Sequence, residues 1–160
     1  MTTWLNEDGL NVKFGNARSE VKPSGVTAAE EKVLTYKLAD ATTIGDTDTA
    51  PSDGHDGFIP AGAHIKDAVL LVKDAFAGAT AVLDIGTKQA DGTTIADDGI
   101  DAAIAVGALT ANTSIISDGA LIGTTVTVDS YITFTYDTAA FTAGSATLVL
   151  KYVEARPTDV

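Results

Sequence analysis

The chain has 160 residues, a net charge of −12 at pH 7 and no cysteine. This length suits one domain of ordinary size with an added arm. The acidity repels a phosphate backbone and no basic cluster interrupts it, so nucleic acid is not an expected partner. Without cysteine, a disulfide framework, a thiolate zinc site and a cysteine nucleophile are excluded. The first residues do not form a signal peptide and no apolar run has transmembrane length, so no membrane partner is expected.

Residues 1–29 are polar and predict an extended arm that precedes a β-sandwich domain of residues 30–160. Glycine steps border one short predicted strand in the arm, over residues 10–14. A segment with so few apolar residues rarely folds alone, so its apolar side chains are candidates to anchor the arm on a partner. These candidate anchors are Trp4, Leu5, Leu10, Val12 and Phe14.

Residues 57–86 hold the strongest apolar concentration in the chain. The step Pro60-Ala61-Gly62 predicts a turn, because proline fixes φ and glycine permits a positive φ. Residues 65–76 are apolar on both parities, which predicts a strand covered on both faces, by a second sheet and by something else. Residues 80–86 then return as a second strand, so the region is interpreted as a central β-hairpin. The candidate oligomer interface on its first strand is Leu70, Val72 and Phe76.

Alternating apolar residues predict further strands on either side of this region. Residues 125–136 are expected to form an antiparallel strand pair that bends at Asp129-Ser130. Two other strands expose one parity and bury the other, with inward positions at Leu34, Tyr36 and Leu38, and at Leu148, Leu150 and Tyr152. Asp-Gly steps recur between the strands and suit tight turns, so the predicted fold class is all-β, an antiparallel β-sandwich.

The loop over residues 40–56 is the one place where the sequence suggests a metal. Its aspartates and His55 offer the oxygen-rich ligands that calcium prefers. An EF-hand register that begins at Asp46 fails, however, because Ala50 and Pro51 stand where a ligand and a glycine are required. We therefore expect a solvated acidic loop, with no metal and no cofactor.

The sequence contains no recognisable catalytic motif. Its two histidines, His55 and His64, belong to no pattern of nucleophile, base and orienting group. The neighbouring carboxyl groups of Asp97 and Asp98 are interpreted as a solvated turn rather than an acid–base pair. We expect no catalytic residues and no enzymatic activity.

Three stretches carry a resemblance to a known group of proteins. The sequence IPAGAHIKDAVLLVKDAFAG, followed by ATAVLDIGTKQADGTTI, resembles a pattern of tailed-bacteriophage virion proteins. The end of the chain, YITFTYDTAAFTAGSATLVLKYVEAR, is similar to the closing strands of the same sandwich, and DGLNVKFG resembles the arms of phage head proteins. The resemblance extends over roughly residues 8–156 and is carried by turns and strands rather than by functional residues.

The resemblance implies a jelly-roll-like β-sandwich that serves as a capsid decoration, or cement, protein. Such a protein binds the major capsid protein on the capsid exterior, often as a homotrimer at local three-fold positions. Two other functions stay open: a receptor- or carbohydrate-binding module of a tail fibre, with Tyr131 and Tyr136 as candidate exposed aromatics, and a hydrolase that uses aspartate pairs.

Overall fold

The computed structural model describes residues 2–5, 11–14, 29–45 and 57–155. Contacts divide the chain into two units, one of Met1–Ala29 with Arg156–Val160 and one of Glu30–Ala155. In the first unit, strand β1 (Thr2–Leu5) pairs antiparallel with β2 (Asn11–Phe14), so that Trp4 lies opposite Val12. The described residues of the second unit form eight strands.

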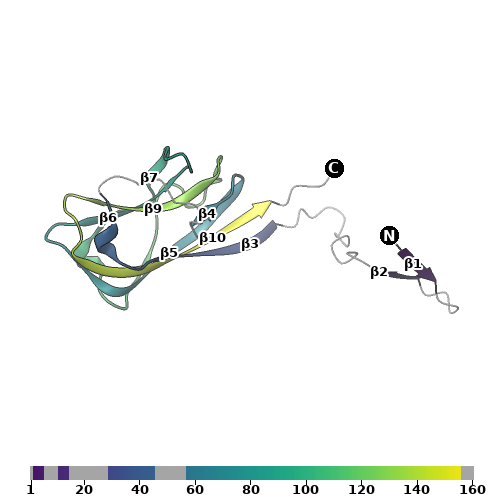
Figure 1. Cartoon of the computed structure of the whole chain (residues 1–160), viewed down its shortest axis with the longest axis horizontal. Helices are drawn as coiled ribbons and strands as arrows, with labels where there is room; N and C mark the ends of the chain where they lie inside the picture. The colour runs from purple at the N-terminus through teal and green to yellow at the C-terminus, as the bar shows by residue number, and fades with distance from the viewer. Residues whose placement is uncertain (1, 6–10, 15–28, 46–56, 156–160) are drawn as a thin grey trace. The chain divides into compact units, whose positions relative to one another are not determined.

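Two four-stranded antiparallel sheets lie face to face in the second unit (Figure 1). The first sheet has the order β3 (Ala29–Leu38), β10 (Ala143–Ala155), β5 (Ala63–Ala77) and β8 (Ser114–Ile116). The second has the order β4 (Phe58–Ile59), β9 (Ser130–Asp137), β6 (Val82–Lys88) and β7 (Thr94–Ala105). Two short 3₁₀ turns, η2 (Ala41–Thr43) and η3 (Val106–Ala108), follow β3 and β7.

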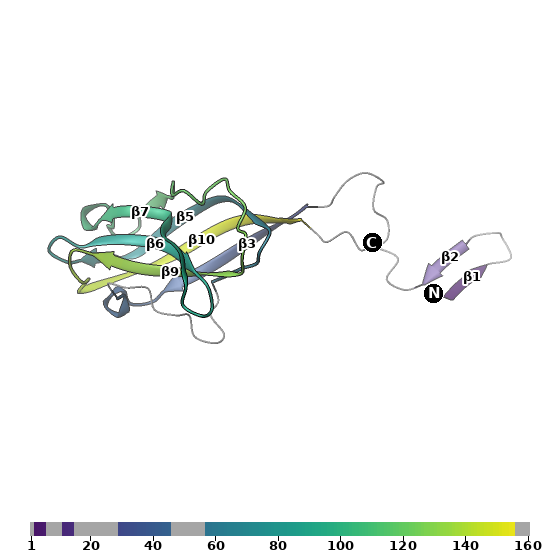
Figure 2. The ribbon, with the colours of Figure 1, turned by 90° about the horizontal axis from the view of Figure 1, so that it is seen from above.

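The strand order is that of a jelly roll. Neighbours in the sheets are β3 with β10, β4 with β9, β5 with β8 and β6 with β7, so the pairs are nested around the connection from β6 to β7. A long antiparallel ribbon rolled onto itself produces this nesting, and rolling lets each sheet bury its apolar side against the other. Figure 2 looks onto β6, β7 and β9, with β5, β10 and β3 behind them. The predicted all-β, jelly-roll-like sandwich is confirmed.

The predicted central hairpin is wrong, because its two strands lie in different sheets. β5 pairs with β10 and β8, whereas β6 pairs with β7 and β9. Paired side by side, the two strands would present their apolar sides in the same direction. Stacked across the sandwich, they bury Leu70 and Leu83 in one core.

A β-bulge explains why β5 is apolar on both parities. Ile65 lies opposite Tyr152 and Asp67 opposite Lys151, so β5 carries one extra residue between these two pairs. The extra residue moves the inward side from odd to even numbers, and Ala68, Leu70 and Val72 then share the core with Ile65. The strand is therefore buried on one face, and Leu71 on its other face stays 43% exposed.

The predicted strand pair over residues 125–136 is a single strand. Only β9 is a strand there, and Thr125 contributes one isolated bridge to His64. The segment before β9 instead bonds along β5, where the Val126 amide donates to the Ala63 carbonyl and the Gly62 amide donates to the Val126 carbonyl. Val126 is buried by this pairing, which leaves Val128 exposed.

The turn predicted at Pro60-Ala61-Gly62 and the inward parities are confirmed, whereas the turn predicted at Asp97 and Asp98 is wrong, because both residues lie within strand β7. The Ala63 amide donates to the Pro60 carbonyl over 3.1 Å, and Gly62 has a φ of 85°, as a type II turn requires. Leu38, Leu148, Leu150 and Tyr152 lie in the core, with Leu34 and Tyr36 packed against it. Tyr36 also stacks on Phe134 across the sandwich, with ring centroids 5.6 Å apart.

Candidate interaction surfaces

The outer face of the sheet β3-β10-β5-β8 carries an uncovered apolar row. Ile116 of β8, Val69 of β5 and Val149 of β10 lie directly opposite one another across three strands. Leu71 adjoins this row on β5, and Val33 projects from the edge strand β3. Ile116 is 76% exposed and Val33 is 59% exposed, and they lie on the two edge strands of this sheet. Exposed apolar side chains that adjoin one another in this way make the row a candidate contact surface.

Lysines surround the apolar row. Lys66 pairs with Glu31 over 2.6 Å, and Lys151 pairs with Asp67 over 3.6 Å. The pairing with Lys66 lowers the pKa of Glu31, first through the hydrogen bond and then through the charge of the ammonium group.

Lys37 and Lys73 have no ion pair or hydrogen bond within the described part of the chain. Four of the six lysines in residues 30–155 thus lie on this one face. We call this surface the lysine face, defined by Val33, Lys37, Val69, Leu71, Lys73, Ile116, Val149 and the two paired lysines.

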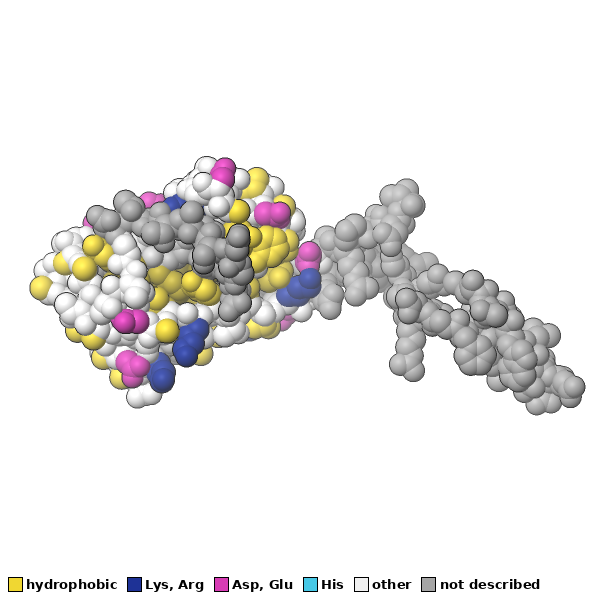
Figure 3. All heavy atoms as spheres, viewed as in Figure 1, with side chains coloured by type: hydrophobic (Ala, Val, Ile, Leu, Met, Phe, Trp, Pro, Cys, Tyr) yellow, Lys and Arg dark blue, Asp and Glu magenta, His cyan; other side chains and the backbone are white. Residues whose placement is uncertain are grey.

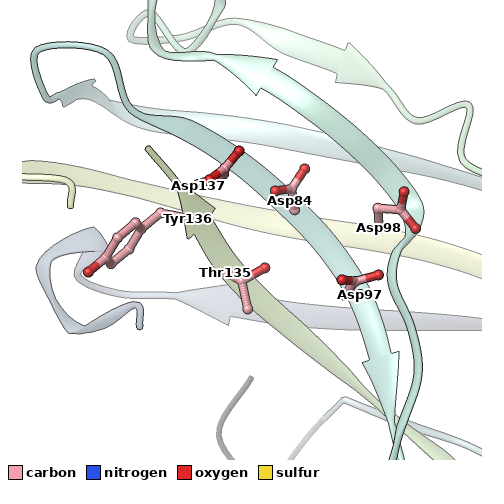
Figure 4. Close-up of a pocket in the computed structure, with 6 residues that line it drawn as sticks. All are labelled: Asp84, Asp97, Asp98, Thr135, Tyr136 and Asp137. Atoms are coloured by element: carbon pink, nitrogen blue, oxygen red, sulfur yellow. The ribbon is translucent and has the colours of Figure 1, made fainter. Parts of the chain in front are cut away.

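The opposite sheet carries a hollow of about 300 Å³ lined by carboxylates. Asp84 of β6 and Asp137 of β9 project on one side of it, and Asp97 and Asp98 come from β7 (Figure 4). Asp84 accepts from the Ala103 amide over 2.7 Å. The remaining lining residues are Thr135 and Tyr136. We call this surface the acidic hollow.

The carboxylates of the acidic hollow retain bonding capacity. Asp137 accepts from the Thr138 amide, whereas the side chains of Asp97 and Asp98 have no hydrogen bond or ion pair among the described residues. No group of three or more metal-binding side chains in the described ranges is arranged to hold a metal ion. The hollow is therefore suited to an ammonium or guanidinium group from a partner, whose charge it would attract.

Charge thus divides the sandwich into two unlike faces. Residues 30–155 contain eighteen acidic residues and six lysines, which accounts for the whole net charge of −12. Along the lower border of the sandwich in Figure 3, basic and acidic side chains lie beside apolar groups. A uniformly acidic body repels its neighbours, and the lysine face is where that repulsion is locally relieved.

Asp101 is a buried carboxyl group on β7, only 5% exposed. Within the described ranges, its Oδ2 atom and the hydroxyl of Ser117 beside it have no hydrogen-bond partner. Burial raises the pKa of Asp101, and the nearby charges of Asp118 and Asp84 add to this effect. The Ser117 hydroxyl and the Ala102 amide lie close enough to favour the charged form, but they only partly oppose the rise in pKa. Asp101 therefore affects stability rather than forming an accessible site.

The structure separates the residues that the sequence nominated. Leu70, Val72 and Phe76 are buried in the core of a single chain. The bulge at Lys66 turns the parity of Leu70 and Val72 inward. A subunit interface on β5 would therefore have to use the other parity, that of Val69 and Leu71. Among the arm anchors, Trp4 and Leu5 lie on β1, Val12 and Phe14 lie on β2, and Leu10 falls outside the described residues.

The remaining candidate groups form no reactive site among the described residues. His64 is exposed, with its Nδ1 atom 3.2 Å from the Thr125 hydroxyl. The loop from Asp46 to Asp56, with His55, lies outside the described residues. Tyr131 and Tyr136 are both half-buried, and Tyr136 packs against the core. In the described part of the chain, no helix is long and apolar enough to cross a bilayer.

Sequence reasoning missed both surfaces. The lysine face requires knowing which parity of β5 points outward, and a bulge decides this. Asp84, Asp97, Asp98 and Asp137 come from three strands, and only the pairing of β6 with β7 and β9 brings them together. A signal was available for the first: Lys66, Lys73 and Lys151 all fall on predicted strands rather than in loops.

Comparison with known proteins gives matches among solved structures only. No protein family and no curated protein matches the sequence. A chain of the structure described as "Cyanophage Pam1 capsid asymmetric unit" superposes with a TM-score of 0.53 and 16% identity, covering 84% of this chain and 91% of that chain. A chain of the capsid of Ralstonia phage GP4 has a TM-score of 0.49 and 18% identity, with 85% and 90% covered. The first likeness shows that this chain has a fold that is present in a phage capsid assembly.

Proposed function

We propose that this protein is a structural virion protein that binds the outer surface of a phage capsid and stabilises it. The observation that carries the proposal is the jelly-roll likeness to a chain of the Pam1 capsid assembly, which extends over most of both chains. A sandwich of this kind supplies a rigid body without needing a reactive site. The proposed partner is the major capsid protein, with the protein acting as a decoration protein and a homotrimer, without enzymatic activity.

The physical mechanism would be clamping by several weak contacts. The arm would lie across neighbouring shell subunits through its apolar residues, with each contact of the order of 1,000 Å². Three arms joined in one trimer would bind with avidity, provided that all three engage together. The acidic surface of the sandwich would keep decorated particles apart.

To test this function, purified protein is mixed with assembled capsids that lack it. The number of copies bound per capsid and the melting temperature of the shell are then measured. Saturable binding that raises the melting temperature supports the function. Trp4→Ala with Phe14→Ala should abolish binding while leaving the sandwich folded. Asn11→Ala, on the same strand β2, is the matched control and should bind normally. Absence of saturable binding by the unmodified protein would overturn the proposal.

A pair of aromatic rings supports a second candidate function, a carbohydrate-binding module. Phe58 of β4 and Tyr131 of β9 lie opposite each other with ring centroids 5.3 Å apart, and Phe58 is 39% exposed. Exposed aromatic faces are surfaces on which sugar rings can stack. A glycan array distinguishes the two functions: a specific sugar ligand that is lost in Phe58→Ala favours this alternative, and an array without binding removes it.

A further inference from the structure

The lysine face and the acidic hollow are complementary surfaces on opposite sheets of one chain. The first has an apolar centre formed by Ile116, Val69 and Leu71, next to the ammonium groups of Lys37 and Lys73, which have no partner among the residues that the structure describes. The second holds four carboxylates, of which Asp97 and Asp98 are unpaired among the described residues. The faces of one sandwich point away from each other, so no chain can bring its own two surfaces together.

We propose that a second copy of this chain docks its acidic hollow onto the lysine face of the first. Lys73 and Lys37 would reach the carboxylates of the next copy, while the apolar row of Ile116, Val69 and Val149 would be covered by the surface beside the hollow. Local charge favours this contact, because ammonium groups of one copy would meet carboxylates of the next. The net charge of −12 on each copy opposes association, so the attraction is confined to these two surfaces.

Charge also decides the geometry of docking. Two lysine faces brought together would place unpaired ammonium groups against one another, so a symmetric two-fold contact through this face is disfavoured. Docking of unlike faces is heterologous, and repetition of one heterologous contact closes into a ring when the rotation allows. The inference does not depend on the proposed capsid role, because both surfaces belong to this chain and neither contains shell residues.

The first experiment measures the mass of the full-length protein by sedimentation equilibrium. We expect a concentration-dependent oligomer whose dissociation constant rises about tenfold or more in Ile116→Asp, because a desolvated carboxylate would be placed in the apolar row. The matched control is Val128→Asp, which adds the same charge at a valine that is 37% exposed and belongs to neither surface. A circular dichroism melt of each variant verifies that the subunit remains folded.

Charge exchange tests which surfaces meet. Lys73→Glu and Asp98→Lys should each weaken association, by about threefold to tenfold, whereas the two substitutions in one chain should restore it. Recovery in the double variant is expected only if the lysine face meets the hollow of another copy. Two single losses that simply add in the double variant would contradict this pairing.

Disulfide trapping tests the geometry, and the absence of native cysteine leaves no background. Under heterologous docking, the chain carrying both Lys73→Cys and Asp98→Cys should form crosslinked oligomers on mild oxidation, and each single variant should stay uncrosslinked. Crosslinking of Lys73→Cys alone would show that lysine faces meet each other and would overturn the proposal. The proposal would also be overturned if the unmodified protein stayed monomeric, or if Ile116→Asp left the oligomer unchanged. Either result would assign the apolar row to another partner. Capsid binding enters none of these measurements, so they can fail independently of the proposed function.

Discussion

The ring of Phe76 in β5 meets the ring of Phe141 edge to face, with centroids 5.2 Å apart and planes at 85°. Both side chains are buried where the chain enters β10. Gly144 lies against this pair with a φ of 137°, and a Cβ atom there would approach Phe76 Cγ to 2.5 Å. The absence of a side chain at Gly144 therefore lets the aromatic pair close this part of the core.

Gly144→Ala should destabilise the sandwich by about 2–4 kcal/mol, because it adds both backbone strain and a clash with Phe76. Gly62→Ala is the matched control: its φ of 85° is also positive, but a Cβ atom there has no neighbour within 4 Å. This control should cost about 1 kcal/mol. Urea unfolding measures both changes, and equal losses would mean that the contact with Phe76 contributes nothing.

A substitution at Gly86 of β6 tests how closely the backbone of β7 approaches β6. A Cβ atom at Gly86 would lie 2.2 Å from the Asp97 carbonyl oxygen and 2.3 Å from that of Ala96, both of which belong to the backbone. Gly86→Ala should therefore separate the two strands and cost about 2 kcal/mol or more. Gly107→Ala, at a position with open space, should leave the urea midpoint nearly unchanged. A harmless Gly86→Ala would contradict the close approach.

The β5 bulge predicts opposite outcomes for two adjacent leucines. Leu70→Ala removes a fully buried side chain and should cost about 2–5 kcal/mol in the free energy of unfolding. Leu71→Ala removes an exposed one and should change it by no more than about 0.5 kcal/mol. Thermal or urea unfolding at a protein concentration too low for association distinguishes them. Similar losses at both positions would mean that β5 is covered on both faces.

The raised pKa of Asp101 predicts that the stability of the folded chain falls as pH rises. Burial raises the pKa of Asp101 in the folded state above its unfolded value, so the folded chain holds the proton more tightly. The contribution of this group to stability is therefore fully present below the unfolded pKa and is lost as pH rises through the folded one. Asp101→Asn removes the ionisation, so the variant should gain stability relative to the parent at pH 7 and lose that advantage towards pH 3. Melting temperatures across this range check it, and a pH-independent difference would contradict the assignment.

Local signals were sufficient for several strands and several turns. In the step Asp91-Gly92, the Thr93 amide donates to Asp91 Oδ1 and Gly92 has a φ of 90°, as the Asp-Gly pattern predicts. The parity of Leu148, Leu150 and Tyr152 also follows from alternation alone, because a regular strand turns successive side chains to opposite faces. These features depend on a few consecutive residues, which is why the sequence reveals them.

The candidate surfaces could not be predicted in the same way. A single extra residue near Lys66 reverses the parity of β5, and neither its position nor its effect can be read from apolar spacing. The choice between a hairpin and opposite sheets for β5 and β6 likewise depends on which strands compete for each edge. The acidic hollow joins Asp84, Asp98 and Asp137 from three strands, so its existence depends on sheet register.

The amino-acid sequence by itself determined the fold class, several turns, the acidity and the side of each regular strand that is apolar. Each of these depends on the chemistry of neighbouring residues and survives any arrangement of the strands. Only the tertiary structure decided which strands pair, which leucine of β5 faces outward, and how lysines gather on one sheet and carboxylates on the other. Those outcomes depend on contacts between residues far apart in the chain, where one shift in register exchanges core for surface.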